Sequence, residues 1–397
     1  MRRHILLILF IASLVAGLQA QTFKALCPTK QEVECKKLRG RKSVEIVRYT
    51  GTNISRDLSI PSFVVYEGKK YLVTSIGKEA FLRGCYGLSS IHIPETITSI
   101  GKYAFYNFDS LVSISVDKRN RVYDSRENCN AIILSKTNKL ILGCPGTVIP
   151  NTVTSIGESA FASCSHLTEI SIPTSVKSLG SGAFFRCNSL TAISIPNSVT
   201  SIGDCAFYYC RSLASVNISS SVTSIGRDVF YFCDSLAYIH VDQNNPVYDS
   251  RDNCNAIVLS KSNKLIVGCQ KTIIPNTVTS IGEGAFSYCV GLTSIDIPSS
   301  VTSIGKEAFH WCDNLTSINI PNSVMSIGDN AFYHCSSLTS INIPNSVTSI
   351  GGGAFHLCNS LTSINIAEDH PVFKVEKEGD TIQIIDKRTG RIVTVVP

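Results

Sequence analysis

The sequence predicts an α/β repeat solenoid, a right-handed superhelix of short strands and short helical turns with β-hairpin insertions. Three observations predict this fold. A unit with the pattern of SLTSINIPNSVTSIGGGAFHLC, which begins at Ser337, recurs every 23 residues. Its leucine column, from Leu88 to Leu361, and its phenylalanine column, from Phe81 to Phe355, are each filled ten times out of ten. Two near copies of another segment lie 125 residues apart. Since one such unit cannot bury its own apolar edge, the units must stack.

Each position of the unit has a structural reason. The pattern Leu-x-x-Ile-x-Ile places alternate side chains inward on a short strand, and the proline that follows ends that strand. Val-Thr-Ser-Ile is predicted as a second short strand, and the glycine after it permits a turn with positive φ. Ala-Phe-x-x-Cys is predicted as a helical turn whose Ala and Phe side chains point into the core. The Ser, Thr and Asn residues between the apolar positions are expected to face solvent.

These units resemble a known family of repeats. The segments IPNSVTSIGDNAFYHCSSLTSINIP and IPTSVKSLGSGAFFRCNSLTAISIP are similar to the BspA-like (Treponema pallidum type) leucine-rich repeats of bacterial surface proteins. The resemblance covers about residues 51–397. It implies a leucine-rich repeat protein exported by a host-associated bacterium and linked to adhesion.

The first twenty residues, MRRHILLILFIASLVAGLQA, have the pattern of an export signal. Arg2 and Arg3 precede an apolar run of 14 residues, which is too short to span a bilayer comfortably, and Ala20 suits a cleavage site. A buried helix or a signal anchor is the alternative. We expect a secreted or cell-surface protein that has no membrane span after signal cleavage.

The repeat register divides the chain. The inserts NRVYDSRENCNAIILSKTNKLILGC and NPVYDSRDNCNAIVLSKSNKLIVGC read as β-hairpins, and the C-terminal tail resembles them. Because the 23-residue register continues after both inserts, we expect one uninterrupted stack. The expected parts are a signal peptide (1–20), an N-terminal cap (21–75), a solenoid of ten units (76–366) with hairpin inserts at about 117–149 and 242–274, and a C-terminal β-hairpin cap (367–397).

Most of the sixteen cysteines follow the repeat. Nine occupy one column, and Phe108 takes the tenth place, so these cysteines are predicted to be buried thiols. Six others fall in the cap and beside the hairpins, where disulfides are possible and buried free thiols are the alternative. The possible pairs are Cys27–Cys35, Cys129–Cys144 and Cys254–Cys269.

No motif in the sequence indicates catalysis. Nucleophile elbows, phosphate-binding loops and zinc-ligand spacings are missing, so we expect no enzyme activity, no cofactor and no metal. Residues 21–50 carry eight Lys and Arg against three Asp and Glu, whereas residues 51–397 sum to about −1. A nearly neutral body argues against binding nucleic acid.

The candidate binding site is a strip of aromatic residues just after the phenylalanine column. Its rings supply the side chains most enriched in binding hot spots. One alternative is that they only cover the core, and another is that the polar strand face binds. The sequence thus favours an adhesion scaffold for an extracellular protein or glycan, acting as a monomer. A structural surface component without a ligand is the alternative function. The strip consists of Tyr208, Tyr209, Tyr231, Phe232, Tyr288, His310, Trp311, Tyr333 and His334.

Overall fold

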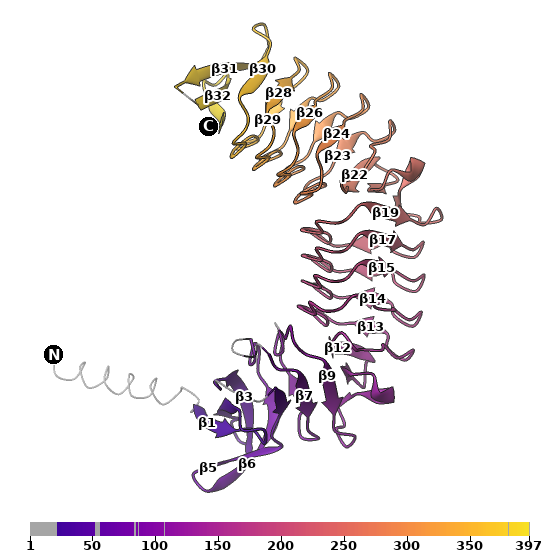
Figure 1. Ribbon diagram of the computed structural model, residues 1–397, viewed down its shortest axis with the longest axis vertical. Helices are drawn as coiled ribbons and strands as arrows, with labels where there is room; N and C mark the ends of the chain where they lie inside the picture. The colour runs from indigo at the N-terminus through magenta and orange to yellow at the C-terminus, as the bar shows by residue number, and fades with distance from the viewer. Residues whose placement is uncertain are drawn as a thin grey trace, which may run out of the picture. The chain divides into compact units, whose positions relative to one another are not determined.

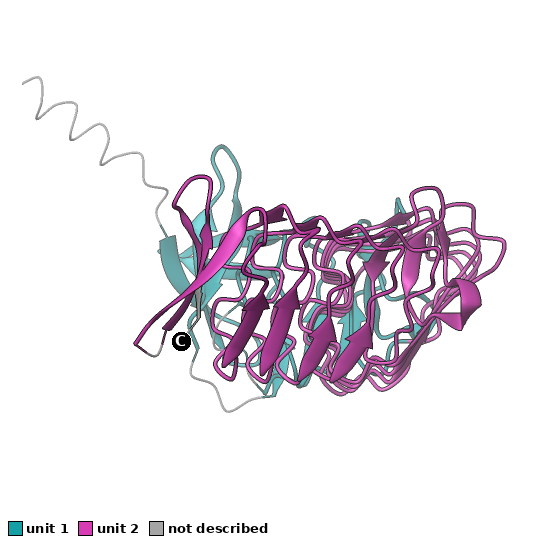
Figure 2. Cartoon of the chain, turned by 90° about the horizontal axis from the view of Figure 1, so that it is seen from above, with its two compact units in different colours: residues 1–137, 142–147 teal, residues 138–141, 148–397 magenta. Residues whose placement is uncertain are grey.

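A computed structural model describes residues 22–51, 56–82, 85, 87–106, 108–379 and 381–396. The chain forms two compact units (Figure 2), which are residues 1–137 with 142–147, and residues 138–141 with 148–397. The division falls within the first insert. The predicted signal peptide lies outside the described residues, and no helix among those described is long and apolar enough to cross a membrane.

The Val-Thr-Ser-Ile segments of unit 2 form two parallel ladders of very short strands (Figure 1). Equivalent residues pair in register at the repeat spacing, as Ser155 does with Ser178. The first ladder comprises β12 (Lys139–Gly143), β13 (Ser155–Ile156), β14 (Ser178–Leu179), β16 (Ser201–Ile202) and β18 (Ser224–Ile225). The second comprises β22 (Lys264–Val267), β23 (Ser280–Ile281), β25 (Ser303–Ile304), β27 (Ser326–Ile327) and β29 (Ser349–Ile350).

The Leu-x-x-Ile-x-Ile segments form a second set of parallel strands. Isoleucines such as Ile318 and Ile341 point into the core, and the asparagines after them, Asn319 and Asn342, are exposed. The predicted alternation along this strand is therefore confirmed. In unit 2 these strands are β15 (Ala192–Ser194), β17 (Ser215–Ile218), β19 (Tyr238–Val241), β24 (Ser294–Asp296), β26 (Ser317–Asn319), β28 (Ser340–Ile343) and β30 (Ser363–Ile366).

The prediction of helical turns in the Ala-Phe-x-x-Cys segment is wrong. Among the described residues, helix is confined to two 3-10 turns in the inserts, η1 (Arg126–Asn128) and η2 (Arg251–Asn253). The backbone takes positive φ twice per unit, for example at Cys205 (54°) and Tyr209 (61°), which no continuous helix allows. Its N–H groups also donate forward to the following unit, as Phe207 does to the Val229 carbonyl (3.0 Å) and Tyr209 to that of Tyr231 (2.9 Å).

Eight of the nine column cysteines are buried as predicted, Cys289 is partly exposed, and the structure adds a reason for cysteine. Each of six thiols donates to the carbonyl of the column phenylalanine in the preceding unit, at 3.0–3.2 Å; Cys335, for example, donates to Phe309 at 3.1 Å. Alanine would fit the space but lacks the donor. The six donors are Cys187, Cys210, Cys233, Cys312, Cys335 and Cys358.

The three expected disulfides, Cys27–Cys35, Cys129–Cys144 and Cys254–Cys269, are not formed in this structure, where all sixteen cysteines are free thiols. At the second insert the two sulfur atoms have different partners. Cys254 donates to the Ala256 carbonyl at 3.8 Å, whereas Cys269 lies 3.1 Å from the carbonyls of both Asn255 and Ala237.

Both inserts contain an antiparallel hairpin. In the second, β20 (Tyr248–Asp249) and β21 (Ile257–Leu259) precede β22, which pairs antiparallel with β21 and parallel with β23. The last strand of the insert is therefore a rung of the solenoid. The corresponding strands of the first insert, in unit 1, are β10 (Tyr123–Asp124) and β11 (Ala131–Leu134).

The rest of unit 1 is a sheet with the strand order β1-β2-β3-β6-β5 and a parallel set β4-β7-β9. β6 also pairs with β8, a rung of the Ser-Ile type. The bounds are β1 (Thr22–Leu26), β2 (Glu32–Lys37), β3 (Ser43–Tyr49), β4 (Asp57–Ser59), β5 (Phe63–Tyr66), β6 (Lys69–Ile76), β7 (Ser90–Ile93), β8 (Ser99–Ile100) and β9 (Ser113–Val116).

The C-terminal tail is a three-stranded antiparallel sheet of β31 (Phe373–Glu378), β32 (Thr381–Asp386) and β33 (Ile392–Val396). It contains one strand more than the predicted hairpin. β33 accepts hydrogen bonds that a following unit would otherwise accept. The Val393 carbonyl and the Thr394 hydroxyl each lie 3.4 Å from N–H groups of the last unit, those of Gly353 and Phe355.

One buried polar residue begins each insert and the tail. The Asn245 amide donates to the Ser219 and Val222 carbonyls, both at 2.8 Å, and its oxygen accepts from the N–H groups of Val247 and Tyr248. Asn120, 125 residues earlier, makes the four equivalent bonds, and His370, 125 residues later, makes three of them, because its ring has only the Pro344 carbonyl as acceptor. Because His370 Nδ1 accepts two N–H groups, its ring must be neutral, with the proton on Nε2.

Candidate binding site: an aromatic strip and a crevice

The forward hydrogen bonds determine where the aromatic side chains lie. They place each residue of the Ala-Phe segment beside its equivalent 23 residues later. The column phenylalanines consequently stack in the core, with the ring centroids of Phe184 and Phe207 5.3 Å apart and their planes 2° from parallel. The two positions after each column phenylalanine lie outside this stack, so aromatic residues there form two surface rows.

All nine predicted strip residues lie in these two rows, and all are half-buried. The second row contains Tyr209, Phe232, Tyr288, Trp311 and His334. Its successive ring centroids are 4.1, 3.8, 6.0 and 3.6 Å apart. The rings of the second row therefore follow one another without interruption along this part of unit 2.

The first row is interrupted. Tyr208 and Tyr231 lie 6.1 Å apart, and His310 and Tyr333 lie 5.0 Å apart, but Ser287 takes the place between these pairs. Tyr288 spans the interruption, with its ring 5.5 Å from that of Tyr231.

The structure extends the strip beyond the predicted residues. Phe185 stacks on Tyr208 at 5.4 Å, and His356 lies 5.6 Å from Tyr333. Both follow a column phenylalanine directly, a signal that the sequence already contained. Two arginines, Arg186 and Arg211, lie over the Tyr209 ring, with their guanidinium carbons 5.3 and 5.4 Å from its centroid.

Burial shifts the pKa of three strip residues toward the uncharged form. It raises the pKa of Tyr208 to about 12 and raises the pKa of Tyr231 further, and it lowers the pKa of His310. His334 Nδ1 lies 2.8 Å from an Asp313 carboxylate oxygen at the edge of the strip. The strip thus offers ring faces and neutral hydroxyl groups to a ligand.

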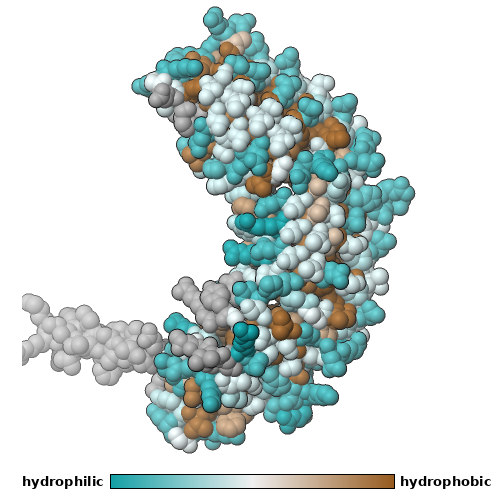
Figure 3. Space-filling model, viewed as in Figure 1, coloured by the Kyte–Doolittle hydropathy of each residue, from teal (hydrophilic) through white to brown (hydrophobic). Residues whose placement is uncertain are grey.

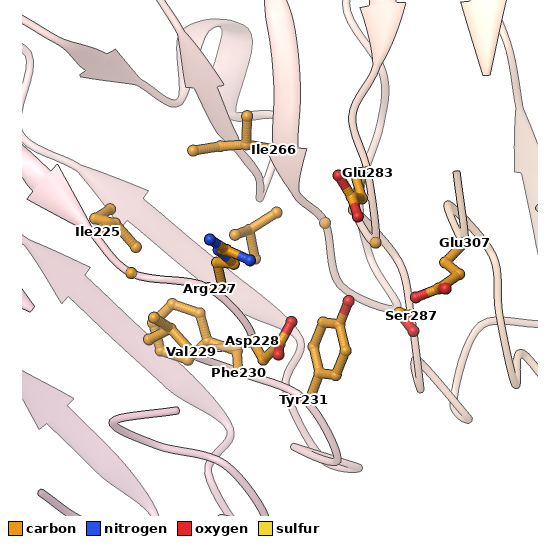
Figure 4. Close-up of a pocket in the computed structure, with 15 residues that line it drawn as sticks. Ile225, Arg227, Asp228, Val229, Phe230, Tyr231, Ile266, Glu283, Ser287 and Glu307 are labelled. Carbon is orange, nitrogen blue, oxygen red and sulfur yellow. The ribbon is translucent and has the colours of Figure 1, made fainter. Parts of the chain in front are cut away.

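A crevice lies where the second insert breaks both the Ser-Ile ladder and the forward hydrogen bonds. In the part of the chain that the structure describes, the N–H groups of Asp228, Phe230 and Phe232 have no acceptor in a following unit. The cavity has a volume of about 370 Å³ (Figure 4). Its apolar wall consists of Ile225, Val229, Phe230, Ile266 and Val267.

Tyr231 connects this crevice with the strip. Figure 4 shows its ring between Asp228 and Ser287, which also line the crevice. Gly284 makes this position possible, since a Cβ there would lie 2.0 Å from the tyrosine oxygen. Glu283 and Glu307 also line the mouth, and Lys306 pairs with both, at 3.7 and 3.3 Å. The crevice is therefore an apolar slot with a polar mouth.

The described residues contain no group of three His, Cys, Asp or Glu side chains that could hold a metal ion. Burial raises the pKa of column thiols such as Cys335, and it also raises the pKa of the partly exposed Cys205 thiol. These sulfur atoms are therefore poor nucleophiles. The strand face, the competing surface, has short exposed side chains that bond to one another, as Asn365 does to Asn342 at 2.7 Å.

Comparison with known proteins identifies the class. A leucine rich cell surface protein from Faecalibacterium prausnitzii is 26% identical, with a TM-score of 0.52 over 88% of this chain and 97% of its own. The pneumococcal vaccine antigen PcpA shares the fold at 20% identity and a TM-score of 0.52, over 86% of this chain and 81% of its own. No curated protein matched the chain. The fold is thus that of bacterial leucine-rich repeat cell-surface proteins.

The family follows from the repeats themselves. The BspA type leucine rich repeat region matches residues 68–140, 144–255 and 265–376, which is most of the chain. The chain therefore belongs to the BspA-type leucine-rich repeat family, as the sequence predicts. This is a family of repeat scaffolds.

Proposed function

We propose that this protein is an exported adhesion scaffold that binds an extended protein or glycan along the aromatic strip. The observation that carries the proposal is the continuous second row of rings from Tyr209 to His334, which passes the second insert without a gap. A ligand that extends over several repeats contacts one ring of this row in each repeat.

Half-buried rings suit this role for an energetic reason. Because each ring is held by its neighbours, little side-chain entropy is lost when a ligand covers the exposed part. Tyrosine and histidine add hydrogen-bonding groups at the ring edges. The strand face offers short side chains that already bond to one another or to water.

The crevice adds an anchoring point beside the rings. Its apolar wall accommodates a side chain of the ligand, and the unpaired N–H groups of Asp228 and Phe230 at its edge donate to a carbonyl oxygen of the ligand. A ligand that lies on the strip at Tyr231 reaches both. Since tyrosine, phenylalanine and tryptophan rings carry no charge at neutral pH, binding is expected to depend weakly on salt.

An array of glycans and extracellular proteins tests the proposal with the chain from Gln21 onward. The triple variant Tyr209→Ala, Trp311→Ala, Tyr333→Ala is expected to lose binding to any ligand that the array identifies. The matched control, Asn319→Ala with Asn342→Ala on the strand face, is expected to retain it, with folding of both checked by circular dichroism. The reverse result would assign binding to the strand face, and an array without any ligand would favour a structural surface component.

A further inference from the structure

The topology of the unit 1 sheet gathers basic residues at one end. β2 ends at Lys37, β3 begins at Ser43, β6 begins at Lys69 and β5 ends at Tyr66, and the strand pairing places these termini together. The turns between the strands lie at the same end. We call this the basic end, and it consists of Lys36, Lys37, Arg39, Arg41, Lys42, Lys69 and Lys70.

These cations are not neutralised by ion pairs. Among the described residues no carboxylate lies within ion-pairing distance of any of the seven, and all but Lys36 and Lys37 are exposed. The nearest acidic positions along the strands are Glu45, the partner of Lys36 in β3, Glu67 in the β5–β6 turn, and Glu34 in β2, which pairs with Arg48 at 3.9 Å. Lys37 lies over the rings of Tyr66 and Tyr71, at 4.4 and 5.3 Å.

The basic end accounts for the charge of the whole chain. Residues 22–76 contain eleven Lys and Arg against five Asp and Glu, a net charge of +6. Residues 77–397 contain 23 against 25, a net charge of −2. A positive field confined to one sheet attracts a polyanion there and not along the repeats.

An apolar face adjoins the basic end. Phe63, Val65 and Leu72 are 46%, 59% and 46% exposed. They share one side of the β5–β6 hairpin with Lys70, because Phe63 pairs with Leu72 and Val65 pairs with Lys70 across the two strands. The Lys70 ammonium lies 3.6 Å from the centroid of the Phe63 ring. Figure 3 shows brown hydrophobic residues among teal ones at the end of unit 1 where Figure 1 places these strands.

We propose that the basic end and the apolar face together bind the surface of an anionic phospholipid membrane. The cations pair with lipid phosphates, and the three apolar side chains enter the interfacial layer beneath them. A soluble acidic polysaccharide would satisfy the cations but leave Phe63, Val65 and Leu72 in water, so the observations favour the membrane. The site is remote in sequence from the strip and independent of the adhesion function proposed above.

Sedimentation with vesicles tests this proposal on the chain from Gln21 onward, without a ligand for the strip. Vesicles of phosphatidylglycerol and phosphatidylcholine are compared with vesicles of phosphatidylcholine alone, and heparin serves as a soluble polyanion. We expect binding only to the anionic vesicles, weakened by salt. A variant with four substitutions, Arg39→Ser, Arg41→Ser, Lys69→Ser and Lys70→Ser, is expected to bind at least ten-fold more weakly.

Two further variants separate the parts of the proposal. The charge-matched control Lys118→Ser, Arg121→Ser, Lys136→Ser and Lys261→Ser removes four exposed cations elsewhere and is expected to bind vesicles within two-fold of the parent chain. Phe63→Ser with Leu72→Ser keeps every charge and is expected to bind anionic vesicles at least three-fold more weakly. Equal losses in the four-fold variant and its control would overturn the proposal. Binding to heparin without binding to vesicles would also overturn it, and so would vesicle binding that is unchanged in the Phe63→Ser, Leu72→Ser variant.

Discussion

Phe232 and Tyr288 are 56 residues apart in the sequence, and their ring centroids lie 3.8 Å apart. The second insert lies between them along the chain and interrupts the forward hydrogen bonds of their repeats, yet the two rings remain in contact. It enters the stack on the opposite edge, where β22 takes the place of a Ser-Ile rung. The strip is consequently continuous where the backbone ladder is interrupted, and the crevice lies between these two features.

Phe230→Ala is expected to destabilise the protein more than Tyr231→Ala. Phe230 is 8% exposed and packs in the core column, and truncation of a buried phenylalanine costs about 3–5 kcal/mol. Tyr231 is half-buried and loses mainly its hydroxyl contacts at the mouth of the crevice. Urea denaturation measures both changes, and equal losses would contradict the assignment of Phe230 to the core.

Gly268→Ala is expected to destabilise the protein by about 1–3 kcal/mol through overpacking. A Cβ at Gly268 would lie 2.0 Å from the ring of Phe286, which cannot move within its column. Gly352→Ala is the matched control, because its Cβ would approach nothing closer than 4.0 Å and its φ is not positive. Thermal melting compares the two variants, and similar melting temperatures would show that the Phe286 ring gives way.

Stability is expected to fall as pH falls, in part because of His370. Burial lowers the pKa of this histidine in the folded protein, so the unfolded chain binds its proton more readily. Its contribution is complete above the ordinary histidine pKa of about 6.5 and is lost as pH falls below that value. His370→Asn is expected to reduce the difference in unfolding free energy between pH 7.5 and pH 5. Asparagine suits the position, since Asn245 makes the same bonds. An unchanged pH dependence would contradict the role of His370.

Cys205 is expected to react first with a thiol reagent in the folded protein. It lies outside the repeat column and is partly exposed, whereas column thiols such as Cys335 and Cys358 are buried. Cys289 is the other partly exposed cysteine, but burial raises the pKa of its thiol well above the ordinary value, so we expect it to react later. Labelling followed by peptide mass spectrometry, with and without urea, gives the order. Early labelling of Cys335 would show that the column opens locally. Under non-reducing conditions the same experiment tests the three cysteine pairs, since each disulfide removes two thiols from the count.

The repeat pattern predicted the inward columns well because identical positions must meet identical environments in every unit. Phe332, Cys335 and Leu338 are therefore buried as expected. The Ala-Phe segment was predicted as helical because its short apolar spacing resembles a helical turn. The sequence does not signal that Trp311 takes a φ of 57°, a conformation that aromatic residues rarely adopt.

Features that depend on pairing between different units were not predictable. The crevice exists because β22 forms no ladder with β18, which no local pattern reveals. The positive charge of residues 21–50 was visible in the sequence, but its concentration at one end required the strand order of the sheet. The equivalence of Asn245 and His370 could not be recognised in the sequence, because two different side chains, an amide and an imidazole, make the corresponding hydrogen bonds.

The forward direction of the backbone hydrogen bonds in the Ala-Phe segment gives this edge of the repeat array a polarity, like that of a filament with two unlike ends. In this segment an internal repeat such as the one holding Phe207 accepts from the repeat before it and donates to the repeat after it, whereas its Val-Thr-Ser-Ile segment donates backward, as Gly203 does to the Leu179 carbonyl. The C-terminal end of the array must therefore be closed by acceptors, which β33 supplies through Val393 and Thr394. A copy of the N-terminal cap could not substitute there unless it offered the same acceptors. Lengthening of the protein by duplication is compatible with this polarity only when the new block is inserted in the same orientation, ahead of the terminal sheet.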